Sequence, residues 1–377
     1  PAPMALGMLV SVALGGVTVL AGRVSKADVA LAAAAPPEVA EAAGGDEAKS
    51  RAIIVATEAP LVAAGAEAPP ELPFMAAFMS RVVANHTRKV EAAVASGEVG
   101  ERGMWKWDVR KRVWDHMEAA RLAWKPIPAH ARSPNFVGSD DAAARLQEMP
   151  EFASAKVVFV GRDAQNDGVR VAVLRAGKTL VMPYSGMREK FLAVVEPSAA
   201  VNASLSWRLR DVQDMGKAVG MEWRGGPVDL IVAGSVAVNP YTGDRIGRGV
   251  GMLDLRYAVL RHMKAVTDRT LVATLVHDCQ VVEDIPSERM LKYDVPVDII
   301  VTPTSVRLVE RAAQPSGDIY WDLLSPQKLG GFAVLGALRA RLEAEGAELS
   351  TGPAELLAPS PFRNRAQRRG RRAKAKA

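Results

Sequence analysis

A glycine-rich stretch carries the clearest chemical signal in the chain. Residues 243–254 read GDRIGRGVGMLD. Glycines at alternating positions let backbone N–H groups curve around a phosphate, and Arg245 and Arg248 add positive charge. Asp254, which closes the stretch, suits a metal ion because a hard cation binds carboxylate oxygens. The stretch therefore predicts a nucleotide site. Its phosphate-facing glycines would be Gly247, Gly249 and Gly251.

Alternating strands and helices are predicted around this stretch and would position it. Residues 228–238 form a continuous apolar run, which is typical of a strand covered on both faces. A helix at 253–263 would follow the loop. The pattern predicts further strands at 156–160, 179–183, 270–276 and 297–302, and helices at 71–96, 104–124, 142–149, 169–176 and 328–346. The predicted fold class is α/β: a three-layer, mostly parallel sheet covered by helices, with ligands at the carboxyl ends of the strands.

Length and composition allow one large domain with extensions or two small domains. The 377 residues are 49% apolar and 24% charged, so most of the chain should fold. Cys279 is the single cysteine, which excludes an internal disulfide and fits a reducing compartment. We divide the chain into a leader-like or disordered segment (1–70), an amphipathic helix and linker (71–103), an α/β domain (104–317), a helical extension (318–360) and a basic tail (361–377).

The N-terminal segment admits three interpretations. Residues 1–22 carry no charge, and Arg23 and Lys26 follow. An uncharged stretch of this length suffices for a membrane span, although its glycines weaken that interpretation. A secretory signal would lack its charged start. We favour the leader of an organelle protein, because Ala-rich sequence continues to about residue 70. The mitochondrion is the first choice, with the chloroplast or the cytoplasm as alternatives.

The C-terminal tail supplies the positive charge of the chain. The formal net charge is +6, and the last fifteen residues hold eight Lys and Arg and no acid. Without these eight, 40 basic residues face 42 acidic ones. RNA contact, an anionic membrane surface and an import or nuclear signal compete with a purely solubilising tail. We favour RNA, because arginine pairs with phosphate and stacks on bases. The candidate nucleic-acid residues are Arg363, Arg365, Arg368, Arg369, Arg371, Arg372, Lys374 and Lys376.

Four segments in order resemble the 5-formyltetrahydrofolate cyclo-ligase family. They are VDLIVAGSVAV (228–238), the glycine-rich stretch, HDCQVV (277–282) and DVPVDIIVTPT (294–304). KWDVR (106–110) and SPNFVG (133–138) look like its divergent branch, the methenyltetrahydrofolate synthase domain-containing proteins. The resemblance covers roughly residues 104–310 and implies a three-layer α/β fold. It also implies an ancestral reaction, the ATP-dependent closure of 5-formyltetrahydrofolate to 5,10-methenyltetrahydrofolate.

The resemblance assigns site residues by position. Lys106 and Arg110 match a pair that grips ATP phosphates, and their spacing of four would place both on one helix face. Asp254 and Asp294 match two acidic positions associated with Mg²⁺. ATP, Mg²⁺ and folate are thus the implied ligands. The phosphate loop matches Arg245, Gly247, Arg248, Gly249 and Gly251.

Two loop residues depart from the family pattern. Val250 stands where active members often carry Lys or Gly, and Met252 where they carry a Tyr that contacts substrate. A Met keeps the packing but not the hydrogen bond of a phenol, and losing a positioned donor often costs about 10²–10³ in rate. A family glutamate near the folate also has no clear counterpart before Gly177.

These departures lead to two hypotheses about function. The first is a cyclo-ligase-fold protein with reduced or lost catalysis, a pseudoenzyme acting in or with a ribonucleoprotein, such as a mitochondrial ribosome, through its basic tail. The alternative is an active ATP- and Mg²⁺-dependent 5-formyltetrahydrofolate cyclo-ligase.

Two further groups of residues have both a structural and a functional interpretation. His277 and Cys279 would point to the same side of a strand end, as a catalytic Cys–His pair requires, but we favour a packing and hydrogen-bonding motif. Four tryptophans within 104–124 would anchor that helix to the core, and the alternative is a base-stacking platform. The other histidines lack metal-ligand spacing, so no zinc site is expected.

Overall fold

The computed structural model describes residues 104–184, 187–200, 215–310 and 315–352, together with 12–13, 16–17 and 88. The chain divides into two compact units, Pro1–Ala64 and Gly65–Ala377. In the first unit, β1 (Val12–Ala13) and β2 (Gly16–Val17) pair antiparallel. All other described elements belong to the second unit. The remaining residues of the 1–70 segment, most of the expected helix at 71–96 and the basic tail lie outside the described residues.

An eight-stranded sheet forms the centre of the second unit, in the order β14-β13-β12-β9-β5-β6-β7-β8. The strands from β13 to β6 run parallel. The antiparallel pairings are β13–β14 at one edge and β6–β7 and β7–β8 at the other. The predicted mostly parallel sheet is therefore confirmed. The strand bounds are Val157–Val160 (β5), Thr179–Pro183 (β6), Leu192–Val195 (β7), Lys217–Val219 (β8), Leu230–Gly234 (β9), Leu271–Leu275 (β12), Ile299–Val301 (β13) and Val306–Leu308 (β14).

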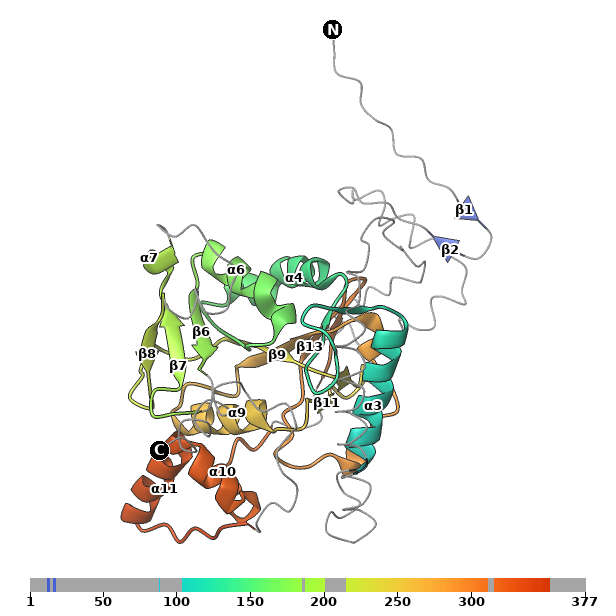
Figure 1. Ribbon diagram of the computed structural model, residues 1–377. Helices are drawn as coiled ribbons and strands as arrows, with labels where there is room; N and C mark the ends of the chain where they lie inside the picture. The colour runs from blue at the N-terminus through green and yellow to red at the C-terminus, as the bar shows by residue number, and fades with distance from the viewer. Residues whose placement is uncertain are drawn as a thin grey trace, which may run out of the picture. The chain divides into compact units, whose positions relative to one another are not determined.

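Helices cover both faces of the sheet, which gives the three expected layers (Figure 1). One face packs against α3 (Met104–Ala119), α4 (Ser139–Gln147), α5 (Pro150–Ser154) and α6 (Asp167–Arg175). The other face packs against α9 (Met252–His262) and α11 (Ala333–Ala344), and α10 (Pro326–Gly331) precedes α11. The shorter helices are α7 (Pro197–Ala200), η4 (Ala164–Asn166), η5 (Asp278–Gln280), η6 (Ser287–Arg289) and η7 (Trp321–Leu323).

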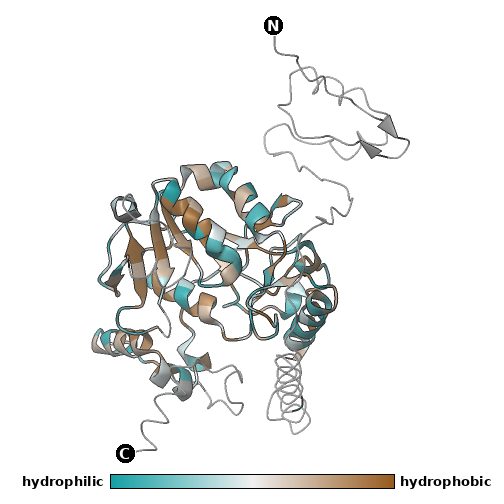
Figure 2. Cartoon of the chain, turned by 45° about the horizontal axis from the view of Figure 1, so that its top comes forward, coloured by the Kyte–Doolittle hydropathy of each residue, from teal (hydrophilic) through white to brown (hydrophobic). Residues whose placement is uncertain are grey.

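The strands are apolar on both faces because each face meets a helix layer. In β5, Val158 and Val160 join the hydrophobic cluster under α4 and α6, whereas Val157 and Phe159 join the cluster against α9. This is the two-residue alternation of a strand, repeated with apolar residues on each side. The strands are accordingly coloured as hydrophobic in Figure 2, and the helices carry hydrophilic segments. Trp105 and Trp114 of α3 are buried in the core, as predicted.

The apolar run at 228–238 is not one strand. It divides at Ser235 into β9 and β10 (Ala237–Val238), and β10 pairs antiparallel with β11 (Arg245–Ile246) outside the main sheet. The side chain of Gln280 donates hydrogen bonds to the carbonyls of Ser235 and Val236, so these backbone groups are satisfied without a sheet neighbour. The break turns the chain into a hairpin that holds the glycine-rich stretch.

Two expected helices are shorter or divided. The helix expected at 104–124 ends at Ala119, and residues after it form β3 (Ala123–Trp124), which pairs with β4 (Asn135–Phe136). The helix expected at 328–346 is divided at Phe332, after two glycines, Gly330 and Gly331, which weaken helical conformation. Among the described residues, no helix is long and apolar enough to cross a membrane.

Candidate functional site

The glycine-rich stretch connects the β10–β11 hairpin to the first turn of α9. Gly249 and Gly251 have left-handed backbone angles, with φ of 95° and 66°, which residues other than glycine rarely adopt. Gly251 is the residue that precedes α9, so the loop ends directly at a helix N-terminus. Helix N-termini present free N–H groups and favour anions. The loop therefore leads directly into a helix N-terminus, the kind of position that favours anions.

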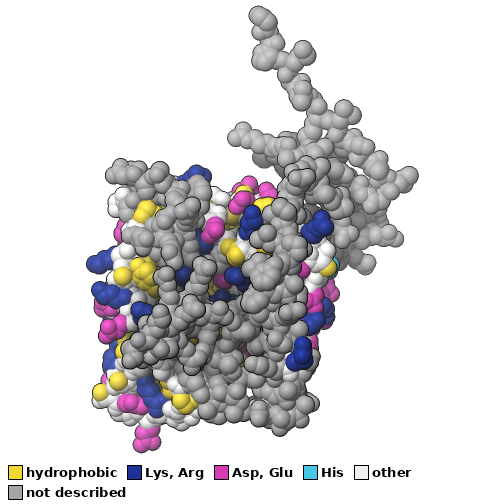
Figure 3. Space-filling view, viewed as in Figure 1, with side chains coloured by type: hydrophobic (Ala, Val, Ile, Leu, Met, Phe, Trp, Pro, Cys, Tyr) yellow, Lys and Arg dark blue, Asp and Glu magenta, His cyan; other side chains and the backbone are white. Residues whose placement is uncertain are grey.

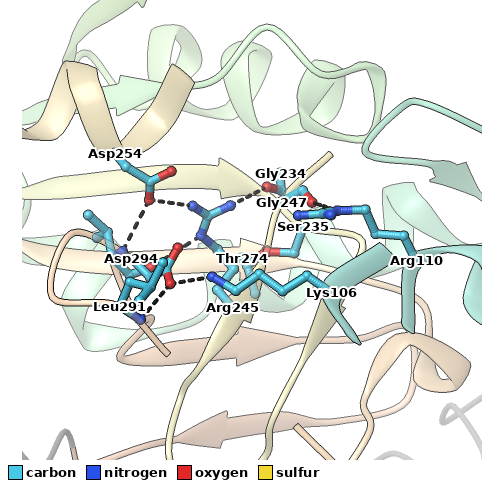
Figure 4. A network of polar contacts seen from close by, with 11 residues as sticks. Lys106, Arg110, Gly234, Ser235, Arg245, Gly247, Asp254, Thr274, Leu291 and Asp294 are labelled. Carbon is cyan, nitrogen blue, oxygen red and sulfur yellow. Dashed lines mark hydrogen bonds and ion pairs between the residues drawn. The ribbon is translucent and has the colours of Figure 1, made fainter. Parts of the chain in front are cut away.

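Helix α3 brings two basic side chains to this loop (Figure 4). Lys106 forms an ion pair with Asp294, and Arg110 donates from Nε to the carbonyl oxygen of Gly247 at 2.6 Å. Both side chains reach the same region from one helix, as expected from their spacing of four. The structure thus brings together residues more than 130 positions apart in the chain.

Arg245 lies inside the protein rather than on the loop surface. Its guanidinium donates to the carbonyl oxygens of Gly234 and Val295 at 3.3 and 3.2 Å and pairs with Asp254 at 3.0 Å. Its side chain is only 4% exposed. Arg245 therefore links the end of β9, the loop and α9 to one another. Its positive charge lies inside the protein and not at the loop surface.

Asp254 and Asp294 are the two candidate magnesium ligands. Oδ1 of Asp254 accepts from the backbone N–H of Val295 at 3.1 Å, and Oδ2 of Asp294 accepts from that of Leu291 at 2.8 Å (Figure 4). In the part of the chain that the structure describes, their other carboxylate oxygens make no hydrogen bond. Those oxygens fit Mg²⁺, which needs only one or two carboxylates when phosphates supply the rest. The described residues include no group of three or more His, Cys, Asp and Glu side chains that could hold a metal.

The charged side chains of Lys106, Arg110, Arg245, Asp254 and Asp294 together carry one excess positive charge at neutral pH. Burial lowers the pKa of Arg110 to about 10, with Asp294 and Asp254 raising it and Arg245 lowering it, so the guanidinium remains protonated. Burial also raises the pKa of Tyr293 to about 12, helped by the same two carboxylates. Three cations, Lys106, Arg110 and Arg245, thus face two carboxylates. This balance suits a ligand that brings negative charge.

The two residues that depart from the family pattern lie in the turn into α9. Met252 is the first residue of the helix and packs, partly buried, against the core on the α9 face of the sheet. Val250 directly precedes Gly251 and is partly buried. Neither side chain offers a charge or a strong hydrogen-bond donor at this point. Arg248, by contrast, is exposed.

A hydroxyl pair at the ends of β9 and β12 was not predicted. Ser235 and Thr274 are labelled in Figure 4, and Ser235 Oγ and Thr274 Oγ1 lie 2.7 Å apart. Thr274 Oγ1 also donates to the carbonyl oxygen of Ala233 at 3.0 Å. Both side chains are fully buried. The sequence signal was a single polar residue near the end of each apolar run, which we treated as part of the strand. These hydroxyls fix the strand ends beneath the loop.

His277 and Cys279 do not lie on a strand end, because β12 ends at Leu275 and His277 caps the 3-10 helix η5; they form a hydrogen-bonding motif, as we favoured. His277 Nδ1 accepts from the backbone N–H of Cys279 at 3.2 Å, and Gln280 Oε1 accepts from that of His277 at 2.8 Å. Burial, with Asp278 nearby, raises the pKa of the Cys279 thiol to about 11. The thiol is therefore protonated at neutral pH and is not an activated nucleophile.

The sequence matches known proteins over the region that contains this site. Residues 102–303 match the 5-formyltetrahydrofolate cyclo-ligase family. The chain is similar to the methenyltetrahydrofolate synthase domain-containing proteins of Danio rerio, with 37% identity over 66% of this chain and 65% of that protein, and of Homo sapiens, with 36% identity over 69% and 68%. The chain therefore spans about two thirds of the length of these relatives.

Solved structures of bacterial enzymes are also similar. A 5,10-methenyltetrahydrofolate synthetase from Aquifex aeolicus is 24% identical, with a TM-score of 0.35, over 55% of this chain and 95% of that one. Its counterpart from Mycoplasma pneumoniae is 14% identical, with a TM-score of 0.32, over 52% of this chain and 98% of that one.

Proposed function

The chain belongs to the 5-formyltetrahydrofolate cyclo-ligase family, and we propose that it is a cyclo-ligase-fold protein that keeps a site for ATP and Mg²⁺ but has reduced or lost catalysis. One observation supports both the retained nucleotide site and the reduced catalysis. Lys106 and Arg110 converge with Asp254 and Asp294 on the glycine-rich loop, whereas the turn that follows the loop carries Met252.

Binding would follow from an exchange of partners within the site. Lys106 pairs with Asp294, and Arg110 donates to the Gly247 carbonyl. A polyphosphate on the loop would accept from both cations, and the carboxylate released from Lys106 could then take part in holding Mg²⁺, which neutralises phosphate charge. Arg245 keeps its three buried contacts throughout and holds the loop in place. The binding step therefore needs no large rearrangement of the described elements.

The rate of catalysis would be reduced, because the reaction needs a positioned hydrogen-bond donor as well as a bound nucleotide. In the family reaction, ATP phosphorylates the formyl oxygen of the folate, the ring nitrogen then attacks the formyl carbon, and phosphate leaves. Met252 packs against the core where active members place a phenol, and Val250 adds no charge. We expect the missing donor alone to lower the rate about 10²–10³-fold.

The proposal includes a ribonucleoprotein partner, reached through the basic tail. Its support is the composition of residues 363–377, in which six arginines and two lysines occur without an acidic residue. A mitochondrial ribosome is the partner that we place first. The alternative function is an active ATP- and Mg²⁺-dependent 5-formyltetrahydrofolate cyclo-ligase, which family membership favours.

One experiment separates the two functions. Purified chain is given 5-formyltetrahydrofolate, ATP and Mg²⁺, and the absorbance of the methenyl product is followed while ATP binding is measured by calorimetry. We expect ATP binding that is lost in Lys106→Gln and kept in Lys111→Gln, an exposed lysine on the same helix that pairs with Asp115. We expect little product. Rapid product formation would overturn the proposed loss of catalysis, and absent ATP binding would overturn the proposed site.

A further inference from the structure

A cavity of about 110 Å³ lies beside α9, next to the end of the glycine-rich loop. Three parts of the chain line it: the N-terminal half of α9, the segment at 292–295, and the extension from Pro315 to Lys328. A cavity needs only about 10–15 Å³ to hold one water molecule, so this one has room for a group of several atoms. Gly251 and Asp254 border it, so it adjoins the residues that we assign to phosphate and Mg²⁺.

One wall of the cavity lies beyond the part of the chain that matches the family. The match ends at residue 303, and the wall is formed from residues 315–328. This wall is part of the folded unit, because Trp321 and Leu324 belong to the same hydrophobic cluster as Tyr257 of α9. Figure 1 shows α10 and α11 beside α9. The extension therefore gives the cavity a wall that the matched region alone does not supply.

The buried part of the cavity lining is apolar. Ala258, Val295 and Leu324 line it and are at most 7% exposed. Burying a charged or strongly hydrated group against such a surface costs free energy, whereas the flat face of a ring fits it. Small-molecule sites in proteins commonly combine an apolar surface of this kind with a few polar groups that fix the orientation of the ligand.

Two tyrosine rings lie at the partly exposed side of the cavity. The ring centroids of Tyr293 and Tyr320 are 6.3 Å apart, with an angle of 53° between the ring planes. Tyr320 has two further contacts: its hydroxyl lies 2.6 Å from Ser316 Oγ, and the ammonium of Lys292 lies 3.9 Å from its ring centroid. These contacts fix the ring of Tyr320. Aromatic side chains of this kind provide faces on which the bases of nucleotides stack.

Polar groups that can take further hydrogen bonds lie beside these rings. Within the described residues, neither the hydroxyl of Tyr293 nor the carboxylate of Asp318 makes a hydrogen bond, and both residues line the cavity. A phenol donates and accepts, and a carboxylate accepts. The edge of a nucleobase carries ring nitrogens and exocyclic groups that include donors and acceptors. The cavity thus combines a surface for the face of a ring with partners for its polar edge.

We propose that this cavity binds the base of a nucleotide, and that the extension supplies residues that recognise it. A nucleotide with its phosphates on the glycine-rich loop would place its base beyond Gly251 and Asp254, in the cavity. Tyr320 stacks on the base, and Tyr293 and Asp318 bind its edge. The inference rests on the proposed function for the phosphates, and it adds to the site residues that lie outside the matched family region.

Calorimetric titration of the full chain with ATP, and separately with inorganic tripolyphosphate, tests base binding in the presence of Mg²⁺. Tyr320→Leu removes the ring and keeps an apolar side chain, so ATP should bind about 10- to 100-fold more weakly. Tyr293→Phe removes only a hydroxyl and should weaken ATP binding about 2- to 10-fold. Neither change should alter the affinity for tripolyphosphate, which has no base. The control is Tyr241→Leu, at a tyrosine that is 63% exposed and outside the cavity lining, which should bind both ligands as the parent does.

Three results would count against base binding, and melting temperatures measured without ligand separate them from poor folding. Unchanged ATP affinity in both Tyr320→Leu and Tyr293→Phe would overturn the base site and leave the phosphate site in place. An equal loss of tripolyphosphate binding in a folded Tyr320→Leu protein would also overturn it, because the extension would then act on the loop and not on a base. A parent chain that binds neither ligand would contradict the proposed function, and base recognition with it.

Discussion

Lys106 and Asp294 form an ion pair between residues 188 positions apart in the sequence. The pair joins α3 to the segment before β13, and its two side chains are only 11% and 14% exposed. An ion pair so well shielded from water affects both the packing of α3 and the charge available to a ligand. In Figure 3, by contrast, the visible basic and acidic side chains lie interspersed on the surface.

Removing Lys106 should destabilise the protein and weaken nucleotide binding together. Lys106→Met leaves Asp294 shielded and unpaired, so we expect the free energy of unfolding to fall by about 2–4 kcal/mol. Urea denaturation measures the change. Lys111→Met is the control, because its exposed pair with Asp115 contributes less than about 1 kcal/mol. Equal losses in the two variants would contradict a special role for the Lys106–Asp294 pair.

Substitution of Arg245 should destabilise the fold, although the sequence places this residue in a predicted ligand-binding loop. Arg245→Met removes donors to two buried carbonyls and leaves Asp254 unpaired, so we expect a loss of about 3–5 kcal/mol in the free energy of unfolding. Arg248→Met, at an exposed position in the same loop, should change stability by less than about 0.5 kcal/mol. A stable Arg245→Met protein would show that these contacts are dispensable.

The buried position of Arg245 could not be predicted from the sequence. The alternation of strands with helices, and the shared helix face of Lys106 and Arg110, both follow from patterns between neighbouring residues. The structure agrees with both predictions. The direction of Arg245 depends on the approach of Val295, fifty residues later, which no local pattern encodes. The edge strands β8 and β14, and β7 next to β8, were missed for a related reason. They have three or four residues each and exist because a neighbouring strand is available for pairing.

Restoring the family residues in the loop should raise activity if the rest of the site is intact. The double variant Met252→Tyr with Val250→Lys supplies a phenol and a charge at the turn into α9, so we expect methenyl product to form about 10²-fold faster or more. Met252→Leu with Val250→Ile is the matched control, since it changes shape without adding a polar group. No gain in the first variant, with folding intact, would mean that other parts of the site have also changed.

Cys279 should react slowly with alkylating reagents at neutral pH. Burial raises its pKa to about 11 from a usual value of 9.0, so the reactive thiolate is about 100-fold rarer in the folded protein than in the unfolded chain at pH 8. The thiolate fraction, and with it the rate, should rise with pH and still be rising at pH 10. Iodoacetamide labelling followed by mass spectrometry, with the urea-unfolded chain as reference, measures this. A native rate that follows the rate of the unfolded chain, with its midpoint near the usual pKa of 9.0, would indicate an ordinary exposed thiol.

The basic tail should account for association with RNA. Its eight positive charges would displace counterions from phosphates, so affinity should fall steeply with salt concentration. Replacing the six arginines at 363–372 by glutamine keeps the length of the chain and should weaken RNA binding and flatten its salt dependence. Lysine replacements are the matched control, because they keep the charge and remove the planar fork that stacks on bases. Sedimentation with organelle ribosomes provides the cellular measurement. If the glutamine variant sediments like the parent, the contact lies elsewhere on the protein.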